Sequence, residues 1–270
     1  MGSVNGGDHL AGQSGFRPGR HGRLECAWLG PPPKAAPTLV FLHDGLGSLG
    51  LWRDFPDRLA RALACGAFVF SRAGHGRSQP PPLPRGTAFM HDEARLELAP
   101  LLAGLGLRVH ALVGHSDGGS IALLNAALAP APGLRGVVTL AAHAFCEPLT
   151  QASIAAARVE FDAGGLRARL ERHHGHNAEA CFRGWSEAWL APGFAAWDIR
   201  PQLRDVRVPV LALQGEDDEY GTVDQLAAIA RAVGQGARTE LLPGCGHSPH
   251  RDRPDAVIAL VSGFLRPLLR

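Results

Sequence analysis

Short apolar segments alternate with amphipathic segments along most of this 270-residue chain, and this alternation limits the possible folds more than any other feature. Residues 38–43 (TLVFLH) form a continuous β-branched and apolar run, which is typical of a strand buried on both faces. Strands separated by helices along a chain form a parallel sheet covered by helices on both faces. The sequence therefore predicts an α/β fold with a mostly parallel, doubly wound sheet. Further strands are expected at 24–29, 67–70, 109–113, 134–141, 208–213 and 239–242, and helices at 51–64, 87–105, 118–129, 223–233 and 255–269.

One stretch interrupts the alternation, because no strand is expected between residues 145 and 203. Segments at 154–161, 166–173 and 178–190 have helical periodicity. We expect a helical cap at 146–203, inserted between two parts of the core at 23–145 and 204–270. The large aromatic side chains of this stretch either line a site beneath the cap or only pack it onto the body, and both can hold at once. These side chains are Phe182, Trp185, Trp189, Phe194 and Trp197.

The composition excludes several classes of protein. Hydrophobic residues make up 46% and charged residues 19%, which suits a chain with a large core and excludes a disordered one. No apolar run reaches the roughly 18 residues that span a bilayer, so a membrane is not an expected partner. The net charge is only +2 and the basic residues are interleaved with acidic ones, so a nucleic acid is not expected either. The five cysteines are widely spaced, which indicates neither a zinc site nor a disulfide framework. Residues 1–22 are expected to be a flexible tail without a signal peptide, which favours a cytoplasmic location.

The motif GHSDG at 114–118 is a G-x-S-x-G sequence centred on Ser116. The expected strand HALVG leads into it and the expected helix GGSIALLNAALA leaves it, which is the context of a sharp turn that exposes a serine at the carboxyl edge of the sheet. Gly114 and Gly118 leave space where a Cβ atom would collide with backbone. The helix N-terminus favours negative charge that develops at the serine. The alternative interpretation is an ordinary strand–helix turn with a capping serine.

A serine hydroxyl needs a base, and the base needs an acid that orients it. The sequence supplies both late in the chain, where the acidic run GEDDE (215–219) follows the strand VPVLALQ and the run PGCGHS (243–248) follows the strand TELL. Loops at the carboxyl ends of parallel strands share one edge of the sheet. We therefore expect Ser116, an acid and His247 to converge there.

These motifs and their order resemble the α/β-hydrolase fold family, in its capped epoxide-hydrolase-like and esterase-like branch, from about residue 24 to the end. The resemblance implies that the acid is Asp218, with Asp217 as the next candidate, and that the base is His247 rather than His250. It also implies a cofactor-free serine hydrolase that acts on an acyl bond. A serine nucleophile argues against the aspartate-dependent haloalkane and epoxide branches.

The resemblance further implies an oxyanion hole made from the Asp117 N–H and an N–H in the loop HDGLGS (43–48). The family usually has His-Gly at the start of this loop, whereas this chain has His43-Asp44. We favour Gly45 as the donor, with Leu46 second. The Asp44 carboxylate must then face away from the anion or be paired. The loop SRAGHGRS (71–78) resembles a structural element of the family that supports the same edge.

A small, largely apolar or aromatic substrate is the expected partner, with a homo-oligomer possible. The residues expected to contact the substrate are Leu46, His115, Trp185 and Trp189. Carbon–carbon bond hydrolysis and acyl-CoA thioester hydrolysis use the same three residues and stay open, as does a non-catalytic small-molecule-binding relative. The cap arginines either pair with a substrate carboxylate or coenzyme A phosphate, or form a solvated surface. These arginines are Arg158, Arg167, Arg169, Arg172 and Arg183.

Two further patterns point to ligands of other kinds. GLGSLG at 45–50 has the G-x-G-x-x-G spacing of dinucleotide-binding loops, but no acid ends the following strand, and a nucleotide site leaves Ser116 and His247 unexplained. The run HHGH at 173–176 lacks a matching carboxylate or thiol cluster, so a solvated surface is the better interpretation. No metal and no cofactor are expected.

Overall fold

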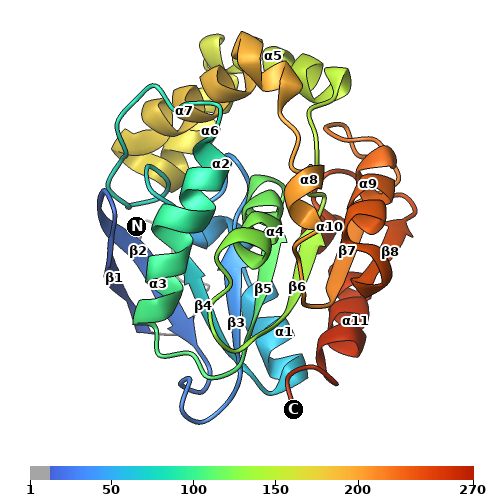
Figure 1. Cartoon of the computed structure of the whole chain (residues 1–270). Coiled ribbons are helices and arrows are strands. Elements are labelled where there is room, and N and C mark those ends of the chain that lie inside the picture. Colours follow the sequence, from blue (N-terminus) through green and yellow to red (C-terminus); the bar gives the residue numbers. More distant parts are fainter. Residues whose placement is uncertain (1–12) are drawn as a thin grey trace.

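The computed structural model describes residues 13–270, which form one eight-stranded sheet with the order β1-β2-β4-β3-β5-β6-β7-β8 (Figure 1). The six strands from β4 to β8 in this order pair in parallel, and β1 and β2 pair antiparallel. The predicted mostly parallel α/β sheet is therefore confirmed. The strands are β1 (Gln13–Gly19), β2 (Gly22–Leu29), β3 (Thr38–Leu42), β4 (Gly66–Phe70), β5 (His110–His115), β6 (Leu134–Leu140), β7 (Val210–Gly215) and β8 (Ala237–Leu242).

Successive side chains of a strand point to opposite faces of the sheet, and those of the central strands are apolar on both faces. Helices therefore cover both faces of the sheet. On β3, Leu39 and Phe41 pack on one face together with α1 (Phe55–Leu63) and α11 (Pro254–Leu265). Val40 and Leu42 point to the other face. That face is covered by α2 (Phe89–Asp92), α3 (Ala99–Gly104), α4 (Asp117–Leu128) and α9 (Asp224–Val233).

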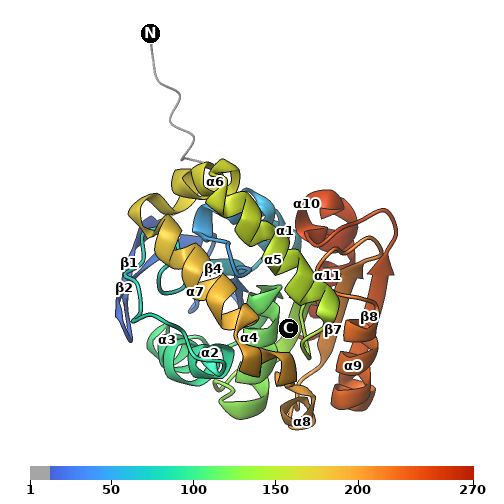
Figure 2. The ribbon, with the colours of Figure 1, turned by 90° about the horizontal axis from the view of Figure 1, so that it is seen from above.

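Between β6 and β7 the chain forms helices and no strand longer than an isolated bridge. The long helices are α5 (Pro148–Asp162), α6 (Gly165–His174) and α7 (Ala178–Leu190), and the short α8 (Arg200–Leu203) leads back to β7. Figure 1 shows α5, α6 and α7 above the sheet, and Figure 2 shows α5 and α7 side by side across this end of the molecule. Among residues 13–270 no helix has the length and apolar character needed to cross a membrane.

The prediction of a flexible tail over residues 1–22 is wrong for its second part. Strand β1 pairs along its whole length with β2 through a turn at residues 20–21, and Gly22, the first residue of β2, has a φ of 122°. Strand β1 is at the edge of the sheet and almost entirely exposed, so it lacks the apolar alternation by which a strand is recognised in a sequence. Residues 1–12 lie outside the described part of the chain.

Candidate active site

The turn between β5 and α4 holds Ser116 in a strained backbone conformation, with a φ of 51° and a ψ of −121°. The turn is tight enough that a Cβ atom on Gly118 would lie 2.2 Å from the Leu42 carbonyl oxygen, and one on Gly114 would lie 2.3 Å from the Gly118 carbonyl oxygen. Only glycine fits at these two positions. The Ser116 N–H donates to the Leu140 carbonyl of β6, which ties the turn to the neighbouring strand.

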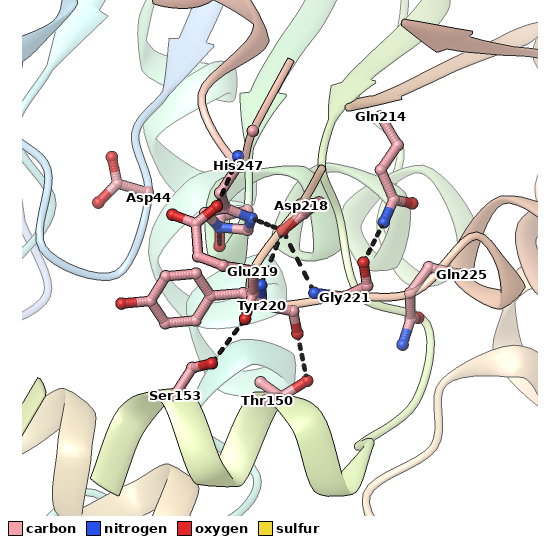
Figure 3. A network of polar contacts seen from close by, with 12 residues as sticks. Asp44, Thr150, Ser153, Gln214, Asp218, Glu219, Tyr220, Gly221, Gln225 and His247 are labelled. Atoms are coloured by element: carbon pink, nitrogen blue, oxygen red, sulfur yellow. Dashed lines mark hydrogen bonds and ion pairs between the residues drawn. The ribbon is translucent and has the colours of Figure 1, made fainter. Parts of the chain in front are cut away.

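The structure brings Ser116, His247 and Asp218 into one hydrogen-bonded series. The Ser116 Oγ lies 2.9 Å from Nε2 of His247. Nδ1 of His247 lies 2.8 Å from Oδ1 of Asp218 (Figure 3). The same Asp218 oxygen accepts the N–H groups of Tyr220 and Gly221. These contacts hold the carboxylate still while it orients the imidazole.

The two alternative candidates lie elsewhere. Asp217 is exposed, and its carboxylate accepts no hydrogen bond from residues 13–270. His250 is buried, and its ring packs against those of Trp52, Phe55 and His115.

Close packing and hydrogen bonds hold the loops after β7 and β8 together. A Cβ atom on Gly215, the last residue of β7, would lie 2.1 Å from the Cys245 carbonyl oxygen. The loop that carries Asp218 is also fastened to α5, because Thr150 Oγ1 donates to the Tyr220 carbonyl at 2.6 Å and Ser153 Oγ donates to the Glu219 carbonyl (Figure 3). These two loops therefore form one unit with the start of α5.

The charges of the series suit a base paired with an acid. Burial by itself would lower the pKa of His247, but the hydrogen bond to Asp218 and its negative charge outweigh burial and raise this pKa above its ordinary value of 6.5. Burial also favours the neutral form of Asp218, yet the contact with His247 and the backbone N–H groups lower the pKa of this carboxyl. Asp218 is therefore ionised near neutral pH, where it stabilises a protonated His247.

Side chains from distant elements fix the loop after β3. The carbonyl of Asp44 accepts from Arg72 Nη2 at 2.8 Å, that of Gly45 lies 3.0 Å from His75 Nε2, and that of Leu46 lies 3.0 Å from His174 Nε2. In a planar trans peptide the N–H points away from the carbonyl. The Asp44 carbonyl and the Gly45 N–H belong to the same peptide group. Because buried Arg72 binds this carbonyl, the Gly45 N–H points away from Arg72.

Two N–H groups at this edge are available for a ligand. Among residues 13–270, neither the Gly45 N–H nor the Asp117 N–H donates a hydrogen bond. The Leu46 N–H, by contrast, donates to Oδ1 of Asp44 at 2.8 Å. This contact favours Gly45 over Leu46 as an oxyanion donor.

The Asp44 carboxylate, which replaces the glycine usual in the family, is paired. Its Oδ2 lies 3.2 Å from Nδ1 of His115, whose Nε2 donates to the His247 carbonyl at 2.7 Å. Burial opposes ionisation of Asp44, but the hydrogen bond and charge of His115 hold its pKa well below the usual range. His115 therefore connects the loop of Asp44 to the loop of His247.

A pocket of about 410 Å³ opens beside Ser116 and His247. Leu46 and His115 line it, as expected, together with Tyr220. Basic side chains surround its other parts; Arg169 and Arg172 were among the cap arginines considered for a substrate anion, whereas Arg53 and Arg251 carried no signal in the sequence because they lie on unrelated segments of the chain. The basic side chains of the lining are Arg53, Arg169, Arg172, His173 and Arg251.

Trp185 and Trp189 are absent from the lining of this pocket, contrary to expectation. The Trp189 ring is buried against Phe194 and Trp197, and its Nε1 donates to the Asp117 carboxylate at 3.2 Å. Trp185 is 7% exposed and packs directly over Gly45. Both rings therefore pack the helical segment onto the body and do not form the pocket walls, which polar side chains share with Leu46, Leu51, Leu166 and Leu170.

The run HHGH divides between two surroundings. His174 is buried and uses both ring nitrogens, one accepting from the Gly76 N–H and one on the Leu46 carbonyl, whereas His173 lines the pocket. No group of three or more His, Cys, Asp or Glu within residues 13–270 has an arrangement that would hold a metal ion. The sequence carried no signal for the role of His174, since its partners lie about 100 residues away or more.

The comparisons with known proteins agree with this geometry. The model of the Alpha/beta hydrolase family matches residues 39–260. The chain is 29% identical over 264 residues to the 2-succinyl-6-hydroxy-2,4-cyclohexadiene-1-carboxylate synthase of Klebsiella pneumoniae, a match that covers 85% of this chain and 94% of that protein. It is 27% identical over 265 residues to the synthase of the same name from Salmonella paratyphi C, which covers 87% of this chain and 96% of that protein. The structure of a thermophilic esterase from Thermogutta terrifontis (malate bound) has a TM-score of 0.70 at 22% identity, covering 96% of this chain and 100% of that one.

Proposed function

Because the chain belongs to the α/β-hydrolase family, we propose that it is a serine hydrolase that cleaves an acyl bond, such as a carboxylic ester, through Ser116, His247 and Asp218. The observation that carries the proposal is the series from Ser116 Oγ to His247 Nε2 at 2.9 Å and from His247 Nδ1 to Asp218 Oδ1 at 2.8 Å, beside a pocket. A nucleophile, a base and an orienting acid in hydrogen-bond contact suit acyl transfer.

In this mechanism the Ser116 oxygen attacks the substrate carbonyl while His247 takes the hydroxyl proton. Asp218 stabilises the protonated imidazole, and the free N–H groups of Gly45 and Asp117 hold the oxygen that becomes negative. His247 then gives its proton to the leaving group, which departs and leaves an acyl group on Ser116. Water, activated by His247, releases the acid and restores the serine.

The helices between residues 146 and 203 act as a cap in this proposal. The hydrogen bonds of Thr150 and Ser153 to the loop of Asp218, and of His174 to the loop of Gly45, support a cap that is fastened beside the site. These contacts also make the cap part of the support for both the acid and the oxyanion loop.

The named relatives favour a second candidate, in which the same residues make a cyclohexadiene carboxylate rather than hydrolyse an ester. The identity of 27–29% extends over most of both chains. The two candidates are separated by assaying ester hydrolysis and formation of that carboxylate with one enzyme preparation. Acyl-CoA thioesters belong in the same panel, and tight binding without turnover would favour a non-catalytic relative.

The direct test combines a covalent label with turnover. A fluorophosphonate is expected to modify Ser116 alone, identified by peptide mass spectrometry, and 4-nitrophenyl butyrate is expected to be hydrolysed by the unmodified protein only. A label on another residue, or equal hydrolysis after complete labelling, would contradict the proposal.

The pH dependence tests the pairing of His247 with Asp218. We expect kcat/KM for the ester to rise with pH through a pKa above 6.5, because only neutral His247 accepts the serine proton and Asp218 raises its pKa. Asp218→Asn removes the charge that outweighs burial, so the rise should move to lower pH while kcat falls by about 10³-fold to 10⁴-fold.

The measurement is a kcat/KM profile between about pH 5 and 9 for wild type and variant. Asp217→Asn, at the exposed neighbouring carboxylate, is the matched control and should leave the profile unchanged. A profile that does not move in Asp218→Asn would show that this carboxylate does not act on His247.

A further inference from the structure

Three arginines from separate parts of the chain lie around the opening of the pocket beside Ser116. Arg53 follows the turn after β3, Arg172 belongs to α6, and Arg251 belongs to α10 (Pro249–Asp252). His173 lines the same pocket, and burial, followed by the charges of Arg172, Arg251 and Arg53, lowers its pKa. Positive charge from three elements therefore meets at one place in the pocket.

These three guanidinium groups form no ion pair and donate no side-chain hydrogen bond within residues 13–270. Arg169 and Arg183 of the helical segment are paired, Arg169 with Glu160 at 2.8 Å and Arg183 with Asp162 at 2.6 Å, whereas Arg158 on α5 has no ion pair within residues 13–270 but does not line the pocket. What distinguishes Arg53, Arg172 and Arg251 is that three unpaired guanidinium groups from separate elements line the one pocket that also holds Ser116 and His247 among the described residues.

The carboxylates of the pocket are already engaged. Asp44 accepts from the Leu46 N–H and contacts His115, and Glu219 accepts the His247 N–H at 3.1 Å. Neither one neutralises the three arginines. A guanidinium group binds carboxylate and phosphate oxygens through two parallel N–H donors, so three unpaired guanidinium groups in one pocket suit an anionic ligand.

We propose that Arg53, Arg172 and Arg251 form an anion subsite, and that the acyl substrate carries a carboxylate or phosphate group that binds there while its carbonyl lies at Ser116. This inference rests on the proposed function. It replaces the expectation of a largely apolar substrate, since the aromatic rings that suggested one pack away from the pocket. The substrate is then an acid with a second, reactive acyl group.

Two esters of similar length test the subsite. The 4-nitrophenyl monoester of glutaric acid ends in a carboxylate, and 4-nitrophenyl hexanoate ends in a methyl group. Wild type is expected to prefer the anionic ester by at least about tenfold in kcat/KM, and about 0.5 M NaCl should reduce the preference because exposed charges are screened.

Arg53→Gln, Arg172→Gln and Arg251→Gln are each expected to lower the ratio of anionic to neutral kcat/KM by about threefold to tenfold, mainly through KM. Arg158→Gln is the matched control, because Arg158 is an exposed arginine of α5 that does not line the pocket, and its ratio should equal that of wild type. Inhibition of hexanoate ester hydrolysis by glutarate and by inorganic phosphate shows which anion binds better.

The outcomes separate this inference from the proposed function. Equal rates on both esters, with ratios that no arginine variant changes, would overturn the anion subsite while leaving the serine hydrolase intact. If neither ester is hydrolysed and the fluorophosphonate does not react, the proposed function fails instead. In that case, calorimetric titration with glutarate and with phosphate still tests whether the three arginines bind an anion. Binding to wild type but not to the triple arginine variant is expected, and binding to both proteins alike, or to neither, would refute the subsite.

Discussion

Ser116→Ala is expected to lower kcat for ester hydrolysis by at least about 10³-fold, the largest effect expected of any single substitution in this protein. The change removes the one oxygen that lies 2.9 Å from His247 Nε2, so no acyl group can be transferred to the protein. Any remaining rate comes from water that His247 activates beside the free N–H groups of Gly45 and Asp117.

The same substitution should leave the fold intact. Alanine meets the same backbone strain as serine at a φ of 51°, so the free energy of unfolding should change by no more than about 1 kcal/mol. Kinetics with 4-nitrophenyl butyrate and thermal unfolding of the same preparation check both parts.

Ser120→Ala is the matched control, because Ser120 lies one turn further along α4 and donates to the His143 carbonyl rather than contacting His247. It should lose some stability and keep most of the activity. If Ser116→Ala instead retained a kcat within tenfold of wild type, catalysis by this serine would be refuted.

The largest effect on stability is expected at Gly215, at the end of β7. A methyl group there would lie 2.1 Å from the Cys245 carbonyl oxygen and 2.3 Å from the Gly246 carbonyl oxygen. Both contacts are with backbone that packs directly against the end of a buried strand, so neither side yields easily. Gly215→Ala should therefore destabilise the protein by about 3 kcal/mol.

The expected loss corresponds to a fall in Tm of about 2–4 °C for each kcal/mol in a chain of this size. Activity should fall as well, because the displaced loop carries His247. Gly263→Ala is the control for a glycine in open space, since no atom lies within 4 Å of its Cβ position on the exposed face of α11. Alanine should stabilise that helix by about 1 kcal/mol, and two Tm shifts of the same sign would contradict the explanation.

The architecture could be predicted from the sequence because the core strands are apolar on both faces. Residues 38–42 and 110–115 are buried throughout. Apolar runs of this kind, when they alternate with amphipathic helices, predict a parallel sheet covered on both faces. The same rule places the loops after β5, β7 and β8 at one edge. Ser116, an acid of the run 215–219 and His247 were therefore expected together before any distance was known, and the family resemblance selected Asp218 as that acid.

The exposed strand β1 could not be predicted from the sequence. Its backbone pairs with β2, but its side chains bury nothing, so the sequence offers no periodicity from which to recognise it. The sequence also left open whether the aromatic side chains near α7 line the pocket or pack against the body, because that depends on how the helices lie on the sheet.

Hydrophobic periodicity and strand order determined the fold and the edge of the sheet at which chemistry can occur, because both depend on neighbours along the chain and on the geometry of a parallel sheet. Only the tertiary structure decided which N–H groups are free, that Asp44 is paired with His115, and that Arg53, Arg172 and Arg251 meet at one opening. Those features depend on contacts between side chains on separate elements. Such contacts follow from the three-dimensional packing of loops and helices, which no local pattern in the sequence encodes.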